Sequence, residues 1–171
     1  RICQGVMVAA KKTLKASLTT HVLRSDGPRA FRRFNNIRGL AEAVVTFDKG
    51  KKLHIINVHS TFARHYTIDM RKREFAVLKD YLAAAGDEPV LLCGDFNFVG
   101  SDPRKKYLKK VYASFTGSLL SPTWRHLTKL SPISANLDYF FWSRRGISVE
   151  PRLLGYKKSD HRALYAKIDI V

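Results

Sequence analysis

The sequence predicts one α/β domain over residues 1–171, and three observations support this class. Apolar residues make up 45% and aromatic residues 11% of the 171-residue chain, which is enough to bury a sizeable core and too apolar for a disordered chain. Short apolar segments typical of strands are interspersed with two segments typical of helices. The sequence shows neither an internal repeat nor a linker that would divide it.

The first third of the chain is predicted to hold three strands. Residues 5–10 form an apolar run typical of a buried strand, and a lysine-rich stretch follows it. Residues 24–38 are loop-like and rich in arginine. Residues 40–47 and 53–58 are apolar strands, and the Asp-Lys-Gly sequence between them is typical of a turn. We therefore expect a hairpin here.

The middle of the chain is predicted to hold two helices around a buried strand. Residues 68–85 carry apolar side chains at helical spacing, with basic residues on the other faces, and Gly86 is a typical helix stop. Residues 90–93 lack alternation, which favours a strand buried on both faces. A second helix is expected from Asp102 and Pro103, because a polar cap followed by proline in the first turn is typical of a helix start.

The end of the chain is predicted to add two strands, residues 137–142 and 162–170. The last strand alternates through Ala163, Tyr165 and Lys167, which indicates that one of its faces is wetter than the other. This mixture of strands and helices, with no division between them, gives the single α/β domain.

The charge balance indicates a polyanionic partner. Lys and Arg number 31 against 14 Asp and Glu, a formal net charge of +17. A field of this sign raises the local concentration of nucleic acid, whose phosphates supply most of the non-specific affinity. An anionic membrane face or simple solubility could use the same charge. No apolar run approaches the roughly 18 residues of a membrane-spanning helix, so we expect DNA or RNA as the partner and no membrane.

The two cysteines, Cys3 and Cys93, favour a reducing, intracellular compartment. They have no metal-ligand spacing, and the sequence has no disulfide framework. Cys93 lies inside an apolar run, which is typical of a buried free thiol. No signal peptide is recognised in the sequence.

Acidic residues are scarce, so their positions are informative. Asp95, Asp138 and Asp160 lie in or beside apolar strands, where a carboxylate is costly unless a metal, a histidine or hydrogen bonds satisfy it. His59 and His161 lie at strand ends. Each of these residues alone could instead be a turn cap or a hydrogen-bonded structural group. Together they predict a site gathered at one edge of a sheet.

Four short motifs resemble, in their order and spacing, those of the endonuclease/exonuclease/phosphatase superfamily. They are Asn57-Val58-His59, Gly94-Asp95-Phe96-Asn97, Leu137-Asp138-Tyr139-Phe140-Phe141 and Ser159-Asp160-His161. A lone Gly-Asp-Phe-Asn would be weak evidence, whereas four motifs in order over nearly the whole chain are specific. The resemblance implies two packed, mostly antiparallel β-sheets flanked by helices, a four-layer α-β-β-α sandwich that is incomplete at the N-terminus.

The same resemblance implies hydrolysis of phosphate esters with a divalent metal, Mg²⁺ or Mn²⁺. Asp95 would orient or deprotonate the attacking water, and Asn97 would hold that water or a phosphate oxygen. His161, oriented by Asp138, would donate a proton or hydrogen bond to the phosphoryl group. Asp160 would assist the metal or the hydrogen bonding of the site, and Asn97 is a second candidate metal ligand.

The chain departs from the family pattern in one respect. Family members carry an Asn and then a Glu, a principal metal ligand, upstream of the opening strand, and nothing in residues 1–35 supplies that pair. The chain would therefore correspond to the C-terminal two thirds of the family's domain, and we expect weakened magnesium binding. An incomplete sheet also invites pairing with another chain.

Candidate substrate contacts lie outside these motifs. Trp124 beside Arg125 could stack on a base or enter a groove, and Lys105 and Lys106 on the second predicted helix could follow a phosphate backbone. A core tryptophan and a solvated helix face are the structural alternatives. His59 matches the histidine that the pancreatic deoxyribonuclease branch places near the leaving group.

Two functions are open on this basis. The first is a magnesium-dependent endonuclease of the apurinic or retroelement type. The alternative is a catalytically degenerate, basic module of this fold that binds nucleic acid as a structural part of a larger assembly; the charge and the missing Glu favour it. A phosphoinositide phosphatase would need a membrane affinity that no feature of the sequence specifically supports.

Overall fold

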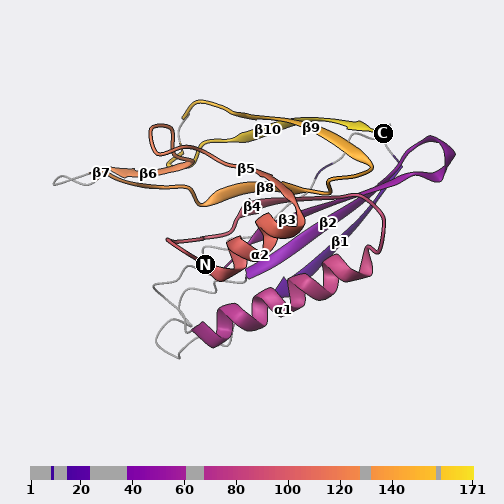
Figure 1. Ribbon diagram of the computed structural model, residues 1–171, viewed down its shortest axis with the longest axis horizontal. Helices are drawn as coiled ribbons and strands as arrows, with labels where there is room; N and C mark the ends of the chain where they lie inside the picture. The colour runs from indigo at the N-terminus through magenta and orange to yellow at the C-terminus, as the bar shows by residue number, and fades with distance from the viewer. Residues whose placement is uncertain (1–8, 10–14, 24–37, 61–67, 128–131, 157–158) are drawn as a thin grey trace.

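A computed structural model describes residue 9 and residues 15–23, 38–60, 68–127, 132–156 and 159–171 (Figure 1). Its largest element is a six-stranded sheet in the order β1-β2-β3-β4-β8-β5. The strands are β1 (Lys15–Leu23), β2 (Arg38–Thr46), β3 (Lys52–His59), β4 (Val90–Asp95), β5 (Ala113–Phe115) and β8 (Asp138–Trp142). β3 and β4 are parallel, and every other neighbouring pair is antiparallel.

Two helices, α1 (Ile68–Ala84) and α2 (Pro103–Val111), cover one face of this sheet (Figure 1). Leu78 of α1 and Leu108 of α2 belong to the same buried cluster as Ile56 of β3 and Leu92 of β4. Burying a side chain of this size contributes about 1.5–3 kcal/mol. This packing fixes the helices against the strands that carry the candidate site.

The other face of the large sheet is covered by a smaller antiparallel sheet of β9 (Ile147–Leu153) and β10 (Leu164–Ile170). Successive side chains of a strand point to opposite faces. Leu92 therefore packs with the helices, whereas Leu91 belongs to a second cluster that includes Ile168 of β10. Figure 1 shows these layers, with the helices on one side of the large sheet and β9 and β10 on the other.

A short antiparallel hairpin of β6 (Trp124–Leu127) and β7 (Pro132–Ala135) lies at one end of the molecule (Figure 1). An isolated bridge pairs Trp124 with His161, in the segment that leads into β10. The hairpin is therefore connected to the last of the four motifs singled out in the sequence.

The second helix begins at the predicted residues. Asp102 is the N-cap of α2: its side chain accepts a hydrogen bond from the Arg104 backbone N–H, and Pro103 is the first helical residue. The same carboxylate pairs with the Arg104 guanidinium at 2.7 Å. Burial opposes the charge on Asp102, but the hydrogen bonds from Arg104 outweigh it and lower the pKa of that carboxyl.

The predicted α/β class is confirmed, with two packed and mostly antiparallel sheets. Both helices of the described residues lie on one face, so this part of the chain shows three of the four expected layers. The hairpin, with its turn at Asp48–Gly50, and both helices are confirmed. The last strand begins at Leu164 rather than at residue 162, and its outward side chains are exposed as expected.

Several elements were not predicted, and some predictions fall on undescribed residues. The strands absent from the prediction are β1, β5, β6, β7 and β9. The predicted strand at residues 5–10, apart from Ala9, and the predicted loop at residues 24–38, apart from Arg38, lie outside the described residues. Cys93 is a free, partly buried thiol, and burial raises its pKa to about 12. Neither described helix is long and apolar enough to cross a bilayer.

Candidate active site

Three of the predicted site residues lie in one row across three neighbouring strands. His59 ends β3 and is paired in register with Asp95, which ends β4. Asp95 is paired in turn with Asp138, the first residue of the antiparallel strand β8. Because β3 and β4 are parallel and β8 runs the other way, the ends of two strands and the start of a third meet at the same edge of the sheet. The sheet thus gathers residues that are far apart in sequence.

Close contact between β3 and β4 depends on Gly94. Its φ is +124°, and a Cβ at this position would lie 2.1 Å from the Val58 carbonyl oxygen. A side chain here would therefore force the two strands apart. The glycine of the Gly-Asp-Phe-Asn motif thus keeps Asp95 beside His59, whose Nε2 lies 3.7 Å from Asp95 Oδ2.

The loop after β4 is fixed by hydrogen bonds of Asp95 and Asn97. The Asp95 Oδ1 accepts a bond of 2.9 Å from the Asn97 backbone N–H. Asn97, only 5% exposed, has a φ of +49°, a conformation that asparagine tolerates better than most residues. Its Nδ2 donates to the Ser60 carbonyl at 2.9 Å, which fixes the plane of the amide. The loop after β4 is thereby joined to the chain just after β3.

His161 forms a close pair with Asp138. The distance from its Nδ1 to Asp138 Oδ2 is 2.8 Å, and both side chains are partly buried. The hydrogen bond to Asp138 raises the pKa of His161 above its ordinary value although burial opposes the charge, and the charges of Asp95 and Asp160 act in the same direction. The pair thus joins an orienting carboxylate to an imidazole with a raised pKa, and the bond through Nδ1 leaves Nε2 to act on another molecule.

Thr123 fixes the backbone at the start of the strand that carries Asp138. Thr123 is fully buried, and its Oγ1 accepts hydrogen bonds from the Leu137 and Asp138 backbone N–H groups at 3.0 and 3.1 Å. Its carbonyl accepts a bond of 2.7 Å from the Arg162 backbone N–H. Thr123 therefore links the strand that carries Asp138 to the segment that carries His161.

The neighbouring residue Trp124 makes the other contact to this segment. Its Nε1 donates to Asp160 Oδ2 at 3.0 Å, and the Arg125 backbone N–H donates to the Asp160 carbonyl at 2.9 Å. Asp160 is exposed. Its carboxylate thus positions the indole of Trp124 and adds negative charge beside His161.

The two predicted metal ligands, Asn97 and Asp160, are not part of the cluster of possible metal ligands in the structure. One ligand atom each of Asp95, Asp138 and His161 lie within 4.8 Å of one another, and this is the candidate metal cluster among the described residues. Asn97 lies beside it, with its amide nitrogen bonded to Ser60, and Asp160 is bonded to Trp124. His161 could join a metal only through Nε2, or by giving up its bond to Asp138.

The predicted substrate contacts are spread over two regions. Trp124 and Arg125 lie beside His161, through the bridge and bonds above. Lys105 of α2 lies over the ring of Tyr139, the residue after Asp138, at 5.6 Å, while Lys106 is exposed on the helix surface. Thr123 could not be singled out for a positioning role from the sequence, because a buried threonine before a tryptophan follows no periodic pattern.

Comparison with known proteins agrees with this geometry. The model of the Endonuclease/Exonuclease/phosphatase family matches residues 4–161. Comparison with curated protein sequences gives no significant match.

Solved structures with the same fold include enzymes of different substrate classes. A mannosyl-6-phosphatase from Bacteroides thetaiotaomicron has a TM-score of 0.64 and 15% identity, over 90% of this chain and 66% of that one. D. rerio TDP2, complexed with a single-strand DNA product, has a TM-score of 0.62 and 19% identity, over 90% and 68%. The human Nocturnin catalytic domain, with bound sulfate, has a TM-score of 0.59 and 14% identity, over 92% and 60%. At these identities the likeness shows the fold, and this chain spans about two thirds or less of each solved chain.

Proposed function

Because the chain belongs to the endonuclease/exonuclease/phosphatase family, we propose that it is a metal-dependent phosphodiester hydrolase that acts on DNA or RNA. The observation that carries the proposal is the Asp138–His161 pair beside Asp95. In-line attack on a phosphodiester requires a base, a charge-stabilising cation and donors to the nonbridging oxygens. Asp95 offers the base and His161 offers the donor, at the end of the sheet where β3 and β4 stop and β8 begins.

Each side chain of the cluster has an assigned task. Asp95 accepts the proton of the attacking water or orients that water. His161, whose pKa is raised by its hydrogen bond to Asp138, donates through Nε2 to the phosphoryl group. His59, next to Asp95, is assigned to the leaving-group side. Asn97 fixes the loop and offers its Oδ1 to the water or the cation.

The donor set suits a divalent cation in part. Hard cations take about six oxygen ligands, and here two partly buried carboxylates, Asp95 and Asp138, lie together with the Asn97 amide beside them. Water and substrate oxygens would complete the set, with Asp160 contributing charge. When bound, Mg²⁺ or Mn²⁺ supplies positive charge that stabilises the phosphoryl oxygens.

Nucleic acid is the substrate class that the charge favours. A net charge of +17 attracts any polyanion, and a nucleic-acid strand presents a row of phosphates along which such a charge acts repeatedly. The single-strand DNA product in the TDP2 complex supports nucleic acid as a ligand of this fold. A phosphomonoester sugar, as for the mannosyl-6-phosphatase, would not need a charge of this size.

A panel of substrates tests the proposal. The purified chain is incubated with supercoiled plasmid, single-stranded RNA, p-nitrophenyl phosphate and an inositol phosphate, each in Mg²⁺, in Mn²⁺ and in chelator. We expect metal-dependent cleavage of at least one nucleic acid and no comparable turnover of the two small phosphate esters. Turnover of a small ester with intact nucleic acid would contradict the substrate class.

A second candidate function is supported by the short supply of metal ligands. Among the described residues the candidate cluster holds two carboxylates, Asp95 and Asp138, and the second of these is bonded to His161. A catalytically degenerate module that binds nucleic acid within a larger assembly would bind plasmid and RNA tightly in the same panel and cleave neither.

A further inference from the structure

A cluster of two arginines around one tyrosine lies next to the candidate active site. The guanidinium carbons of Arg125 and Arg162 lie 5.5 and 5.4 Å from the centroid of the Tyr156 ring. The hydroxyl of Tyr156 donates to the Pro122 carbonyl at 3.0 Å, which fixes the ring in place. Each cation is attracted to the face of the aromatic ring, so Tyr156 supports both guanidinium groups.

Arg162 is held by hydrogen bonds to neutral groups. Its Nε donates to the Leu154 carbonyl at 2.6 Å, and its Nη1 donates to the Ser121 hydroxyl. A guanidinium has five N–H donors, so these two bonds fix its orientation and leave donors for another molecule. The group is therefore preorganised in the way that a phosphate site requires.

The positive charge of this cluster is not neutralised by ion pairs of the described residues. None of the ion pairs formed in the described ranges includes Arg125 or Arg162, whereas Arg104 and Lys52 both have carboxylate partners. The nearest acidic residue along the chain, Asp160, directs its carboxylate to the Trp124 indole. Two uncompensated cations on an aromatic support are suited to an external anion.

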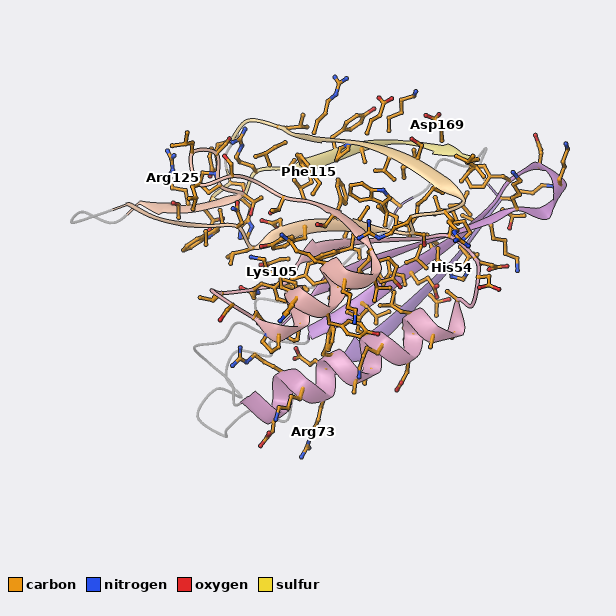
Figure 2. All side chains as sticks on the ribbon, viewed as in Figure 1. His54, Arg73, Lys105, Phe115, Arg125 and Asp169 are labelled. Atoms are coloured by element: carbon orange, nitrogen blue, oxygen red, sulfur yellow. The ribbon has the colours of Figure 1, made fainter. Side chains whose placement is uncertain are left out.

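The cluster is connected by backbone bonds to the catalytic pair. Trp124 is bridged to His161, and the residues that follow each of them are Arg125 and Arg162. The Arg162 N–H donates to the Thr123 carbonyl at 2.7 Å. Figure 2 labels Arg125 on the same end of the molecule as the β6–β7 hairpin. Because successive side chains of a strand point to opposite faces, Arg125 and Arg162 lie on the other face of this bridge from Trp124 and His161. An anion bound here would therefore be a second one, separate from an anion at His161.

We propose that Arg125, Tyr156 and Arg162 form a second phosphate-binding subsite, which takes a backbone phosphate of the nucleic-acid strand other than the phosphate held at His161. The inference rests on the proposed nucleic-acid substrate and names the residues that would hold the strand. Two separated phosphate positions explain why a strand would be favoured over a small phosphate ester, which fills only one of them.

Binding in chelator tests this subsite without requiring cleavage. The affinity of the chain for a fluorescent DNA duplex is measured over a series of salt concentrations, for the wild type, Arg125→Gln, Arg162→Gln and Arg73→Gln. The last is a matched control, because it removes one exposed cation from α1, in the helical layer (Figure 2). Melting curves check that each variant is folded, and Arg125→Gln removes no side-chain hydrogen bond formed with the described residues.

Loss of one phosphate contact should make the plot of log affinity against log salt shallower by about 0.9 for a duplex. At 0.1 M salt this corresponds to an affinity roughly eight-fold weaker than that of the wild type, with the curves converging towards 1 M. We expect this result for Arg125→Gln and Arg162→Gln. Arg162→Lys should retain most of the slope, and Arg73→Gln should leave the slope unchanged.

An equal effect of Arg73→Gln and Arg125→Gln would overturn the subsite, because only the overall charge would then matter. Unchanged duplex affinity combined with weaker binding to phosphatidylserine vesicles would also overturn it, in favour of a membrane contact. The outcome is separable from that of the proposed function: a chain that cleaves nothing can still show the two arginine-specific changes in slope, and an active chain can lack them.

Discussion

At the scale of single residues, the candidate site depends on groups that orient the side chains with proposed catalytic roles. The Asp138 carboxylate orients His161, and Thr123 orients Asp138 through its backbone. A buried hydroxyl that accepts two N–H groups is hard to replace, since an apolar side chain leaves both donors without a partner. Thr123 is therefore a positioning residue whose effect on chemistry passes through Asp138.

Replacing Thr123 with valine keeps the shape of the side chain and removes the acceptor. We expect Thr123→Val to destabilise the fold by about 1–3 kcal/mol, the range for a buried polar group left unsatisfied. It should also lower the pKa of His161 towards its ordinary value, because Asp138 would no longer be held against the imidazole. NMR titration of the His161 ring protons measures this pKa.

Thr123→Ser is the control, since it keeps the hydroxyl and should keep the raised pKa of His161. A valine variant that is destabilised but has an unchanged His161 pKa would assign Thr123 a role in stability alone. Asp138→Asn gives the reference value for an imidazole without its carboxylate.

At the scale of elements, the site is built by the register between strands. Gly94 is the residue on which this register depends most, because its α-carbon lies against the backbone of β3. Gly94→Ala should destabilise the fold by at least about 2 kcal/mol, since the Cβ meets backbone and the backbone has a positive φ. Gly100→Ala is a matched control: its φ is +60° and no atom lies within 4 Å of the new Cβ.

Unfolding of the two variants by urea measures the difference. We expect Gly100→Ala to lose only the cost of its left-handed backbone, about 1–2 kcal/mol. Equal destabilisation of the two variants would mean that the contact with Val58 does not limit the approach of β3 and β4.

His54 joins three elements at the opposite end of the strands from the site. Its Nδ1 lies 2.6 Å from Glu42 of β2 and its Nε2 lies 2.6 Å from Glu88 in the connection between α1 and β4. Burial disfavours the imidazolium, but the two carboxylates outweigh it and raise the pKa of His54 above 6.5. Lys52, paired with Glu88, and Tyr81, whose pKa is raised by burial and by the charge of Glu42, are the other titratable groups nearby.

The stabilising effect of His54 should therefore depend on pH. A raised folded-state pKa means that the contribution is fully present below the ordinary pKa of about 6.5 and is lost as the pH rises through the folded-state value. The difference in melting temperature between the wild type and His54→Gln should be largest near pH 5.5–6 and should shrink as the pH rises (about 1.4 kcal/mol per unit of pKa shift). A difference that grows with pH would contradict the assignment.

The elements that could be predicted from the sequence are those with local signals. The hairpin of β2 and β3 has a turn sequence, α1 has helical periodicity, and α2 has a cap and a proline. β9 was missed although its side chains alternate in burial, because Glu150 and Pro151 interrupt the apolar pattern. A proline is tolerated in this two-stranded sheet, where every strand is an edge. The described side chains of β1, those of residues 15–20, are mostly exposed, and the strand is defined by its pairing with β2.

In the candidate site, too, some features have a local signal in the sequence and others do not. Asp95 and Asp138 could be predicted as site residues because they lie at the ends of apolar segments. Their position side by side depends on the register between β4 and β8. The role of Thr123 and the cluster around Tyr156 depend on contacts between short segments far apart in the chain. No local pattern in a sequence reports such contacts.

At the scale of the whole molecule, the layered fold positions the residues of the candidate site, whereas the net charge attracts polyanions to the molecule. The packed sheets and the helices hold in place the ends of β3 and β4 and the start of β8, where the residues with the proposed catalytic roles lie. The net charge of +17 concentrates polyanions around the molecule but selects no position on it. Under the proposed function, specificity for a phosphodiester would come from the residues of the candidate site and from the proposed subsite.

Single-turnover cleavage of the nucleic acid selected by the substrate panel tests the central claim most directly. Asp95→Asn and His161→Ala are compared with the wild type and with Arg73→Gln, in Mg²⁺ and in chelator. Loss of a general acid or base costs about 10²–10⁴-fold in rate, so we predict at least a hundred-fold loss in both site variants, with Arg73→Gln close to wild type and no cleavage in chelator. Cleavage that persists in both site variants would contradict the account, because the reaction would then occur without the cluster at the strand edge.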